Sequence, residues 1–219
     1  MKKIFTPLAG IVLLLACQCN TQSVEKEDVT TMEEVKDTLK TEQYEGYYKV
    51  PIEAISNDLF LINHQWMLIT SGNETDFNTM TASWGGFGTL WNKPINFMFV
   101  RNTRYTFEFL EKNVNYTISF YDTAKYKDVL TMLGTKSGRN TDKIKESGFT
   151  PLQMPQGSMA FAEADMIIEC SILYKDQLNP HNISSKEILN MFDFYTNEKK
   201  IDRHYVFFGE IVSVWKKEK

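Results

Sequence analysis

The sequence predicts a mainly β domain, a closed or partly closed antiparallel barrel with a few peripheral helices. Two observations predict it: five segments have the apolar alternation of strands, and only three have helical spacing. The helices do not alternate strictly with the strands, which argues against a doubly wound parallel sheet. The 219 residues are 42% apolar and 13% aromatic, which is enough for a packed core.

The predicted strands occupy residues 66–70, 95–101, 116–121, 161–173 and 205–214. The second and third are the clearest, because Ile and aromatic residues occupy every second position, the period at which side chains return to one face of a strand. In the last two strands, the faces predicted to lie in the core consist of Ile168, Cys170 and Ile172, and of Val206, Phe208 and Val212.

Apolar residues recur at helical spacing in residues 105–112, 125–133 and 186–195. Two serines precede the third segment and can cap a helix there. Its apolar stripe consists of Ile188, Leu189 and Phe192. Helices are therefore expected to be a minority around a β scaffold.

The first segment of the chain is expected to be an export signal and not part of the fold. Two lysines are followed by an apolar run over residues 8–16, which is too short to cross a bilayer as a helix. The run ends in Leu-Leu-Ala before Cys17, which resembles the lipobox of bacterial lipoproteins. That resemblance implies that residues 1–16 are removed and that Cys17 carries a lipid anchor, on the periplasmic face or in the outer membrane. A plain secretory signal is the alternative.

Residues 17–45 are predicted to form an acidic tether. From residue 20 onward this stretch has no Gly or Pro, and eight acidic against three basic residues give it a charge of −5. The folded domain then comprises residues 46–219 and is close to neutral.

The charge and the cysteines exclude several classes of protein. The net charge of −4 is too acidic for a chain whose main partner is nucleic acid. Three cysteines cannot form the disulfide framework of a small secreted domain, and no His or Cys pair has the spacing of a metal site. Cys170 lies in a predicted strand among apolar residues, so we expect a core residue and not a redox thiol.

The segment with the most distinctive chemistry is residues 78–86, Asn-Thr-Met-Thr-Ala-Ser-Trp-Gly-Gly. Thr81, Ala82 and Ser83 can offer polar groups to the edge of a flat heteroaromatic ring, and Trp84 can offer an apolar surface to its face. A glycine-rich hairpin ending in core aromatics is the alternative. No helix is predicted after the glycines, so this is neither a dinucleotide-binding fingerprint nor a P-loop.

Four strings of residues follow one another along the chain. They are residues 78–86, 100–106 (Val-Arg-Asn-Thr-Arg-Tyr-Thr), 134–143 (Gly-Thr-Lys-Ser-Gly-Arg-Asn-Thr-Asp-Lys) and 204–211 (His-x-x-Phe-x-Gly-Glu-Ile). Together they resemble the flavin reductase-like proteins with an FMN-binding split barrel, and among them the flavoredoxins. The resemblance covers residues 51–215, and it implies an FMN-binding split β-barrel.

The resemblance also implies a homodimer with non-covalent FMN at the subunit interface and no catalytic side chain beyond the flavin. Asn78 and Trp84 would lie against the flavin, Thr106 near its phosphate or ribityl chain, and Lys143 and His204 at its polar rim. Taken together with the residues selected for their chemistry, the full set of predicted cofactor-binding residues is Asn78, Met80, Thr81, Ala82, Ser83, Trp84, Arg101, Arg104, Thr106, Ser137, Arg139, Lys143 and His204.

The basic residues of this set also have ordinary structural interpretations. Arg101 and Arg104 close a strand and open a helix, where basic side chains are often solvated. Lys143 follows a loop that can be functional or merely solvated, and His204 can be a hydrogen-bonded histidine at a strand start. A phosphate dianion needs cations and hydroxyl donors, which Arg101, Arg104, Thr106 and Lys143 can supply, and which of the four does so stays open.

The function that the resemblance implies is electron transfer through FMN. NADH or NADPH is one candidate donor, and a membrane or periplasmic donor is the other, because an exported protein meets little free nicotinamide nucleotide. The alternatives are a carrier that binds flavin or haem without turnover and a structural lipoprotein with an empty barrel. The segment of residues 175–203 is longer than expected between the last two strands, and it can cover or reshape the pocket.

Overall fold

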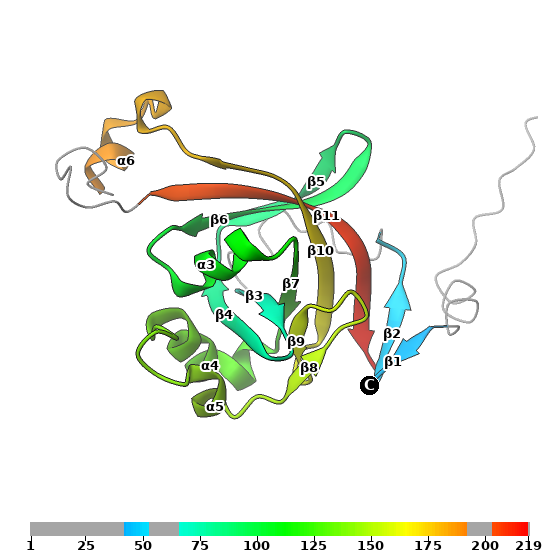
Figure 1. Ribbon diagram of the computed structural model, residues 1–219. Coiled ribbons are helices and arrows are strands. Elements are labelled where there is room, and N and C mark those ends of the chain that lie inside the picture. The colour runs from blue at the N-terminus through cyan, green and yellow to red at the C-terminus, as the bar shows by residue number, and fades with distance from the viewer. Residues whose placement is uncertain (1–41, 53–65, 192–202, 219) are drawn as a thin grey trace, which may run out of the picture.

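The computed structural model describes residues 42–52, 66–191 and 203–218, and the fold is one strongly curled antiparallel sheet with helices packed around it (Figure 1). The strands run in the order β1-β2-β11-β10-β7-β3-β4, with β6 beside β11 and β5 beside β6. Within these described ranges β4 and β5 do not pair, so the barrel is partly closed. The mainly β fold class predicted from the sequence is confirmed.

The elements have the following bounds. The curled sheet consists of β1 (Gln43–Tyr44), β2 (Tyr47–Val50), β3 (Met67–Asn73), β4 (Asp76–Ala82), β5 (Gly85–Leu90), β6 (Lys93–Arg101), β7 (Asn115–Phe120), β10 (Met166–Gln177) and β11 (His204–Lys217), and a separate hairpin consists of β8 (Pro151–Gln153) and β9 (Met159–Phe161). The helices are α3 (Tyr105–Lys112), α4 (Thr123–Thr135), α5 (Lys143–Ser147) and α6 (Lys186–Met191), with a 3-10 turn at Pro180–Asn182. In the part of the chain that the structure describes, no helix is long and apolar enough to cross a membrane.

The barrel core forms from alternate residues of its strands. Tyr116 and Ile118 of β7 are fully buried in it, as the alternation predicts. In β6, however, the residues in the barrel are Met98 and Val100, while the aromatic residues of that strand lie on the opposite face and stay partly exposed. The aromatic face of β6 therefore points out of the barrel.

The strand predicted over residues 161–173 is two strands in two different sheets. β9 ends at Phe161 and pairs with β8, whereas β10 begins at Met166 and pairs with β7 and β11. A turn separates them, in which the Ala164 amide donates to the Phe161 carbonyl at 3.1 Å. The Tyr47 hydroxyl, arriving from β2, donates to the Ala164 carbonyl at 2.7 Å and holds this turn in place.

The face predicted for β11 from simple alternation is wrong, because neither Val206 nor Phe208 belongs to the barrel core and Val212 is 39% exposed. The pairing of β10 with β11 shifts register beside Cys170, so that Val212 is an extra residue in a β-bulge. The bulge exchanges the two faces of the strand. The β11 side chains that reach the barrel core are Phe207, Ile211 and Val214.

The face predicted for β10 is confirmed. Ile168 and Cys170 belong to the barrel core, and Ile172 packs against it. Burial raises the pKa of the Cys170 thiol to about 12, so the thiol is protonated at neutral pH and behaves as a core residue.

A second apolar cluster lies on the outer side of the sheet, under α4 and the β8–β9 hairpin. Leu130 and Leu133 of α4 meet Phe161 and Trp215 there. The Asp122 side chain caps the start of α4 by accepting from two amides of its first turn. Burial of Leu130 and Leu133 holds the carboxyl end of α4 against the sheet, and that end borders the site described below.

The predicted helices over residues 105–112 and 125–133 are confirmed as α3 and α4. The third, α6, is described only to Met191, and Phe192 of the predicted stripe lies outside the described residues. Ile188 is 39% exposed, so this part of the stripe is not buried in the core. The strands β10 and β11 run on beyond the barrel as an arm and carry α6 away from it (Figure 1).

Candidate functional site

Two pockets lie side by side near the ends of β4 and β6. The larger, here called the open pocket, has a volume of about 190 Å³. The smaller, here called the polar pocket, has a volume of about 50 Å³. Met80 and Arg104 line both pockets, so one elongated ligand can extend from the first into the second.

The floor of the open pocket comes from β4 and from the bend that follows it. β4 supplies Met80, Thr81 and Ala82, and the bend supplies Ser83 and Trp84. The sequence segment with small and hydroxyl side chains is therefore a strand end followed by a bend, whose backbone borders the pocket.

The opposite wall of the open pocket comes from β6 and β11. These strands pair so that His204, the first residue of β11, lies directly opposite Arg101, the last residue of β6. Phe99 completes this wall, and its amide donates to the Trp84 carbonyl at 3.4 Å. Two basic side chains therefore border the pocket beside two aromatic ones.

Trp84 is an exposed aromatic surface and not a core residue. Its side chain is 45% exposed, and its ring centroid lies 5.4 Å from that of His204 at an interplanar angle of 38°. His204 is 7% exposed. The alternative of a hairpin that ends in core aromatics is therefore wrong for Trp84, and an indole surface at the pocket is available to a flat ring.

Two cations gather at the carboxyl end of α4, beside the polar pocket. The Lys143 ammonium donates to the carbonyls of Leu133 at 3.0 Å and Lys136 at 3.3 Å, and the Arg104 guanidinium donates to the carbonyl of Gly134. The last turn of α4 has no basic residue of its own. The negative end of the helix dipole thus holds cations that come from other elements of the fold.

The charge of Lys143 is sensitive to its surroundings. Lys143 is 3% exposed, and burial, followed by the nearby positive charge of Arg104, lowers the pKa of its ammonium to about 8. An anion beside this ammonium would offset both effects and raise the pKa again. The polar pocket is therefore suited to a small dianion.

Hydroxyl groups complete the polar pocket. Thr106 and Ser137 line it together with Thr103 and Thr135. Thr106 is 1% exposed, and its hydroxyl accepts from the Asn78 side-chain amide at 2.7 Å. Asn78 lines neither pocket, and it orients a pocket hydroxyl from behind.

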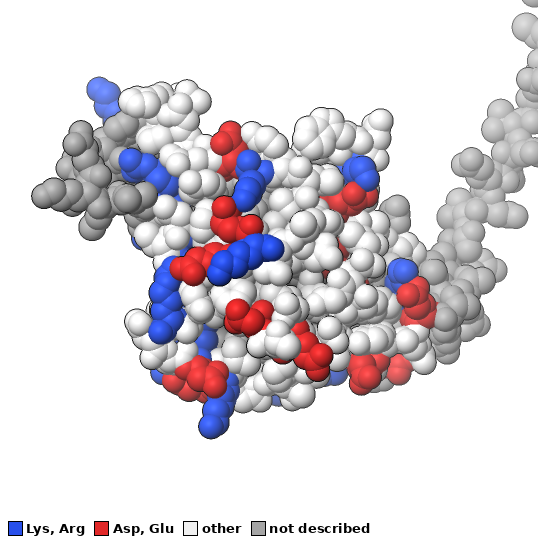
Figure 2. Space-filling model, in the orientation of Figure 1, with Lys and Arg blue, Asp and Glu red and all other residues white. Residues whose placement is uncertain are grey.

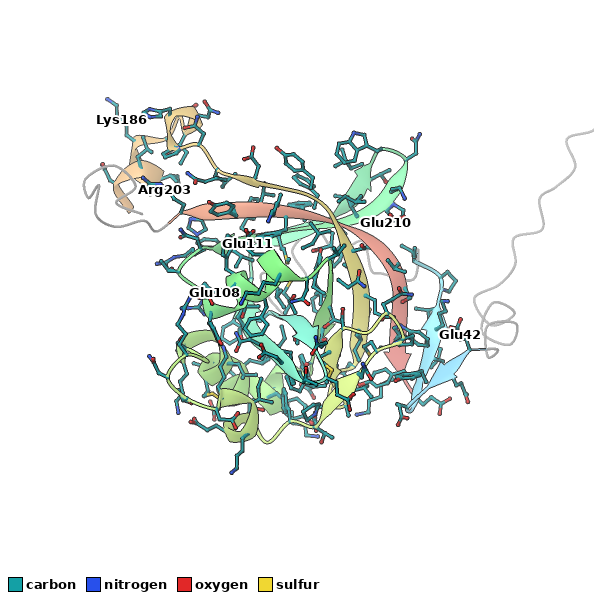
Figure 3. The ribbon with its side chains drawn as sticks, viewed as in Figure 1. Glu42, Glu108, Glu111, Lys186, Arg203 and Glu210 are labelled. Atoms are coloured by element: carbon teal, nitrogen blue, oxygen red, sulfur yellow. The ribbon has the colours of Figure 1, made fainter. Side chains whose placement is uncertain are left out.

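Arg139 lies outside both pockets. Its guanidinium pairs with Glu108 of α3, donates to the Thr103 carbonyl at 3.0 Å, and lies 5.0 Å from the centre of the Tyr105 ring. Figure 3 shows Glu108 on α3, on the side of that helix facing the loop before α5. Arg139 therefore ties the loop of residues 136–142 to α3, and the polar pocket lies between the two.

The structure brings eleven of the thirteen predicted site residues to the two pockets, all except Asn78 and Arg139. The sequence reasoning missed Phe99, Thr103, Tyr105, Thr135 and Lys136. All but Phe99 lie inside the strings at residues 100–106 and 134–143, so a signal for them was present. The described residues of the 175–203 segment line neither pocket, although Arg203 precedes His204. In those residues the segment does not cover the pocket as expected.

The face of the molecule seen in Figure 2 carries charges of both signs rather than a patch of one sign. Figure 2 shows Lys and Arg side chains interspersed with Asp and Glu over the face that carries α3 and α4. Several of these side chains form ion pairs, such as Lys175 with Glu111 and Lys136 with Glu146. Within the described ranges, no group of three or more His, Cys, Asp and Glu residues is arranged to hold a metal ion.

The curled, partly closed antiparallel sheet makes this molecule a split-barrel protein. Residues 60–219 match the family model described as the flavin reductase like domain, and the chain belongs to that family. No curated protein matches the sequence.

Solved structures share the fold at low sequence identity. An FMN-binding domain of a flavin reductases-like enzyme from Shewanella baltica superposes with a TM-score of 0.56 at 15% identity, covering 78% of this chain and 77% of that one. The FMN-binding protein from Thermus thermophilus with bound p-hydroxybenzaldehyde has a TM-score of 0.54 at 20% identity, covering 69% and 71%. The flavoredoxin of Desulfovibrio vulgaris has a TM-score of 0.52 at 21% identity, covering 76% and 75%.

Proposed function

We propose that this protein binds FMN without a covalent bond and transfers electrons through it. The observation that carries the proposal is the pair of adjoining pockets, one open and aromatic, the other small, polar and beside two cations. Flavin ring and phosphate differ in the same way, since the ring is flat and mostly apolar and the phosphate is a compact dianion. The residues present therefore fit FMN, with its ring toward Trp84 and its phosphate toward Lys143.

Different side chains hold the phosphate and the ring of the cofactor. Lys143 and Arg104 neutralise the phosphate, and Thr106 and Ser137 donate hydrogen bonds to it. Near the ring, a hydrogen-bond donor at the polar edge would stabilise negative charge that develops on reduction, and the His204 imidazole lines that part of the open pocket.

FMN, when bound, supplies the redox chemistry by accepting a hydride or electrons and passing them to an acceptor. The chain itself positions the ring and neutralises charge, and no side-chain acid or base is assigned to the reaction. In a reductase, NADH or NADPH is the electron donor. If the protein is exported, a membrane or periplasmic donor takes that place, because little free nicotinamide nucleotide is available there. The competing function is a carrier that binds flavin or haem without turnover, and the experiment below separates the two.

The proposal includes a homodimer with the cofactor at its interface. The open and polar pockets together are smaller than the roughly 300 Å³ at the low end for pockets that bury most of a ligand. A second chain that covers the open side would complete the enclosure. The proposal also keeps the exported lipoprotein, anchored through Cys17 by way of the acidic tether at residues 17–45.

The test is the visible absorption spectrum of the purified domain, residues 42–219, with FMN and then with NADH or NADPH added without oxygen. A yellow protein that bleaches on adding a nicotinamide nucleotide supports a flavin-dependent reductase. A yellow protein that stays yellow supports another donor or a carrier, and a colourless protein that ignores FMN refutes the proposal.

Replacing Trp84 with Ala is expected to weaken FMN binding about five- to tenfold, because a stacking surface worth about 1 kcal/mol beyond area burial is lost. Fluorescence titration measures the change. Val114→Ala, which removes an exposed apolar side chain that lines neither pocket, serves as the control, and unchanged affinity in Trp84→Ala would remove Trp84 from the site.

FMN affinity is expected to fall as the pH rises above about 8, by up to roughly tenfold per pH unit. Below pH 8 Lys143 is protonated with and without ligand, whereas above it the phosphate must recruit a proton to Lys143. The second phosphate pKa is near 6, so the phosphate itself stays dianionic over this range. Isothermal titration calorimetry between pH 7 and 9 measures the affinity and the proton uptake.

A control separates this effect from alkaline unfolding. The pKa of Lys143 is lower in the folded chain than its ordinary value of 10.5, so between about 8 and 10.5 the unfolded chain binds more protons, and folding becomes more favourable as the pH rises. As the pH rises above about 8, FMN affinity should therefore fall while the contribution of Lys143 to the free energy of unfolding rises. A pH profile retained in Lys143→Met would contradict the assignment.

A further inference from the structure

The outward faces of β6, β10 and β11 carry a row of aromatic side chains that belong to neither core cluster. This outer aromatic face consists of Phe97, Phe99, Phe208 and Tyr174. The ring centroids of Phe97 and Phe208 are 6.2 Å apart, and those of Tyr174 and Phe208 are 6.0 Å apart. Tyr174 is 43% exposed and the three Phe residues are partly exposed.

The neighbouring strand β5 presents almost no side chains on the same side. Gly86 pairs opposite Phe97, and a Cβ on Gly86 would lie 2.7 Å from the Phe97 ring, so the ring rests on bare backbone. Gly88 pairs opposite Ile95, and a Cβ there would meet nothing within 4 Å. The result is a flat strip of backbone beside the aromatic rings, which another surface can approach closely.

The hairpin that joins β5 to β6 displays a tryptophan at its tip. Trp91 is 64% exposed, with a φ of 51°, and Asn92 follows with a φ of 57°. A two-residue turn with two left-handed positions suits Asn and Gly, and it strains a large side chain such as Trp. The hairpin extends beyond the barrel (Figure 1). The turn therefore holds an exposed indole where another surface can reach it.

Trp91 cannot reach the open pocket of its own chain. Trp84, which lines that pocket, and Trp91 flank the two ends of β5, and a strand of six residues spans about 20 Å. A two-fold axis halfway along β5 would, however, bring Trp91 of one chain to Trp84 of another, because an isologous interface pairs each contact with its reciprocal. That midpoint lies at Phe87 and Gly88, beside the outer aromatic face.

The charges of this region allow a second copy to approach. The folded domain is close to neutral, so two copies do not repel strongly. Lys93, which directly follows the turn of the hairpin, is paired with Glu210 at 2.6 Å, and Figure 3 shows Glu210 on β11 close to that hairpin. The central rings of the face are uncharged, as the core of an interface between protein chains usually is.

We propose that a second copy of this chain packs on the outer aromatic face, and that Trp91 of each copy covers the open pocket of the other. This inference rests on the proposed function, and it names the residue that closes the site. Trp91 thereby becomes a binding residue of the partner's site rather than of its own.

The test mixes two variants of residues 42–219. Trp91→Ala keeps the pocket and loses the cover, whereas Ser83→Trp fills the open pocket and keeps the cover. Each alone is expected to bind FMN at least roughly tenfold more weakly than the wild type, as loss of a central aromatic contact predicts. Refolded together, they form mixed dimers in which on the order of one site in four has both an intact pocket and Trp91.

Recovery of wild-type affinity at that fraction of sites supports the proposal. Val114→Ala, at a residue that is 63% exposed and lines neither pocket, is the matched control and should change neither FMN affinity nor the mass measured by light scattering. A wild-type monomer that binds FMN, unchanged affinity in Trp91→Ala, or no recovery in the mixture overturns this inference and leaves the proposed function intact. Failure of the wild type to bind FMN overturns both.

Discussion

Replacing Lys143 with Met is expected to weaken FMN binding by roughly 10- to 100-fold and to leave riboflavin binding nearly unchanged. Lys143 is buried beside the polar pocket, and a hydrogen bond between a cation and a phosphate contributes about 1.5–3 kcal/mol. Met keeps the length and apolar character of the side chain and removes the charge. Riboflavin lacks the phosphate, so it reports every other effect of the substitution.

Lys145→Met is the matched control, because Lys145 lies on the same helix, α5, with its side chain exposed. Fluorescence quenching with FMN and with riboflavin gives the four affinities needed. Equal losses for both ligands in Lys143→Met would show that Lys143 acts only by holding the end of α4, and the assignment of the phosphate to the polar pocket would be rejected.

Replacing Gly209 with Ala is expected to destabilise the fold by about 3 kcal/mol. A Cβ on Gly209 would lie 2.1 Å from the hydroxyl of Tyr116, which is fully buried in the barrel core and donates to Asn96 at 3.2 Å. Overpacking of this kind costs about 1–3 kcal/mol or more, because neither the ring nor strand β11 has space to move. A chain of this size then melts about 6–12 °C lower.

Urea unfolding and thermal melting measure this loss. Val212→Ala is the control, because this side chain lies on the same strand and is 39% exposed. Starting from Tyr116→Phe, which removes the closest atom, the same Gly209→Ala change should cost less. Equal stability of wild type and Gly209→Ala would mean that the packing of Tyr116 against β11 is looser than the structure describes.

The strand content and the location of the site were predictable from local patterns. Side chains of a strand alternate with a period of two, so the positions of Tyr116 and Ile118 predict a buried face without reference to the neighbouring strands. The strings at residues 78–86 and 204–211 lie at a strand end and a strand start, where side chains such as Trp84 and His204 border a pocket rather than fill a core.

Where alternation failed, a distant segment decided the outcome. In β6 the aromatic residues, which have the greatest affinity for a core, face outward, because the barrel interior is taken by Met98, Val100 and the ring of Tyr116. In β11 Phe207 and not Phe208 faces the barrel core, and the bulge at Val212, which depends on the register with β10, exchanges the two faces beyond it. In neither strand can the residues of that strand alone predict which face is buried.

The site shows the same division. Arg139 and Lys143 belong to one string, yet Arg139 pairs with Glu108 on the outside while Lys143 is buried on the carbonyls of α4. By itself, the sequence determined the class of fold, the elements and the chemical groups that meet at the site, because these depend on residues near one another in the chain. The tertiary structure alone decided which cation is buried, which strand face is inside and why Gly209 must be glycine, because burial and steric contact depend on segments far apart in sequence.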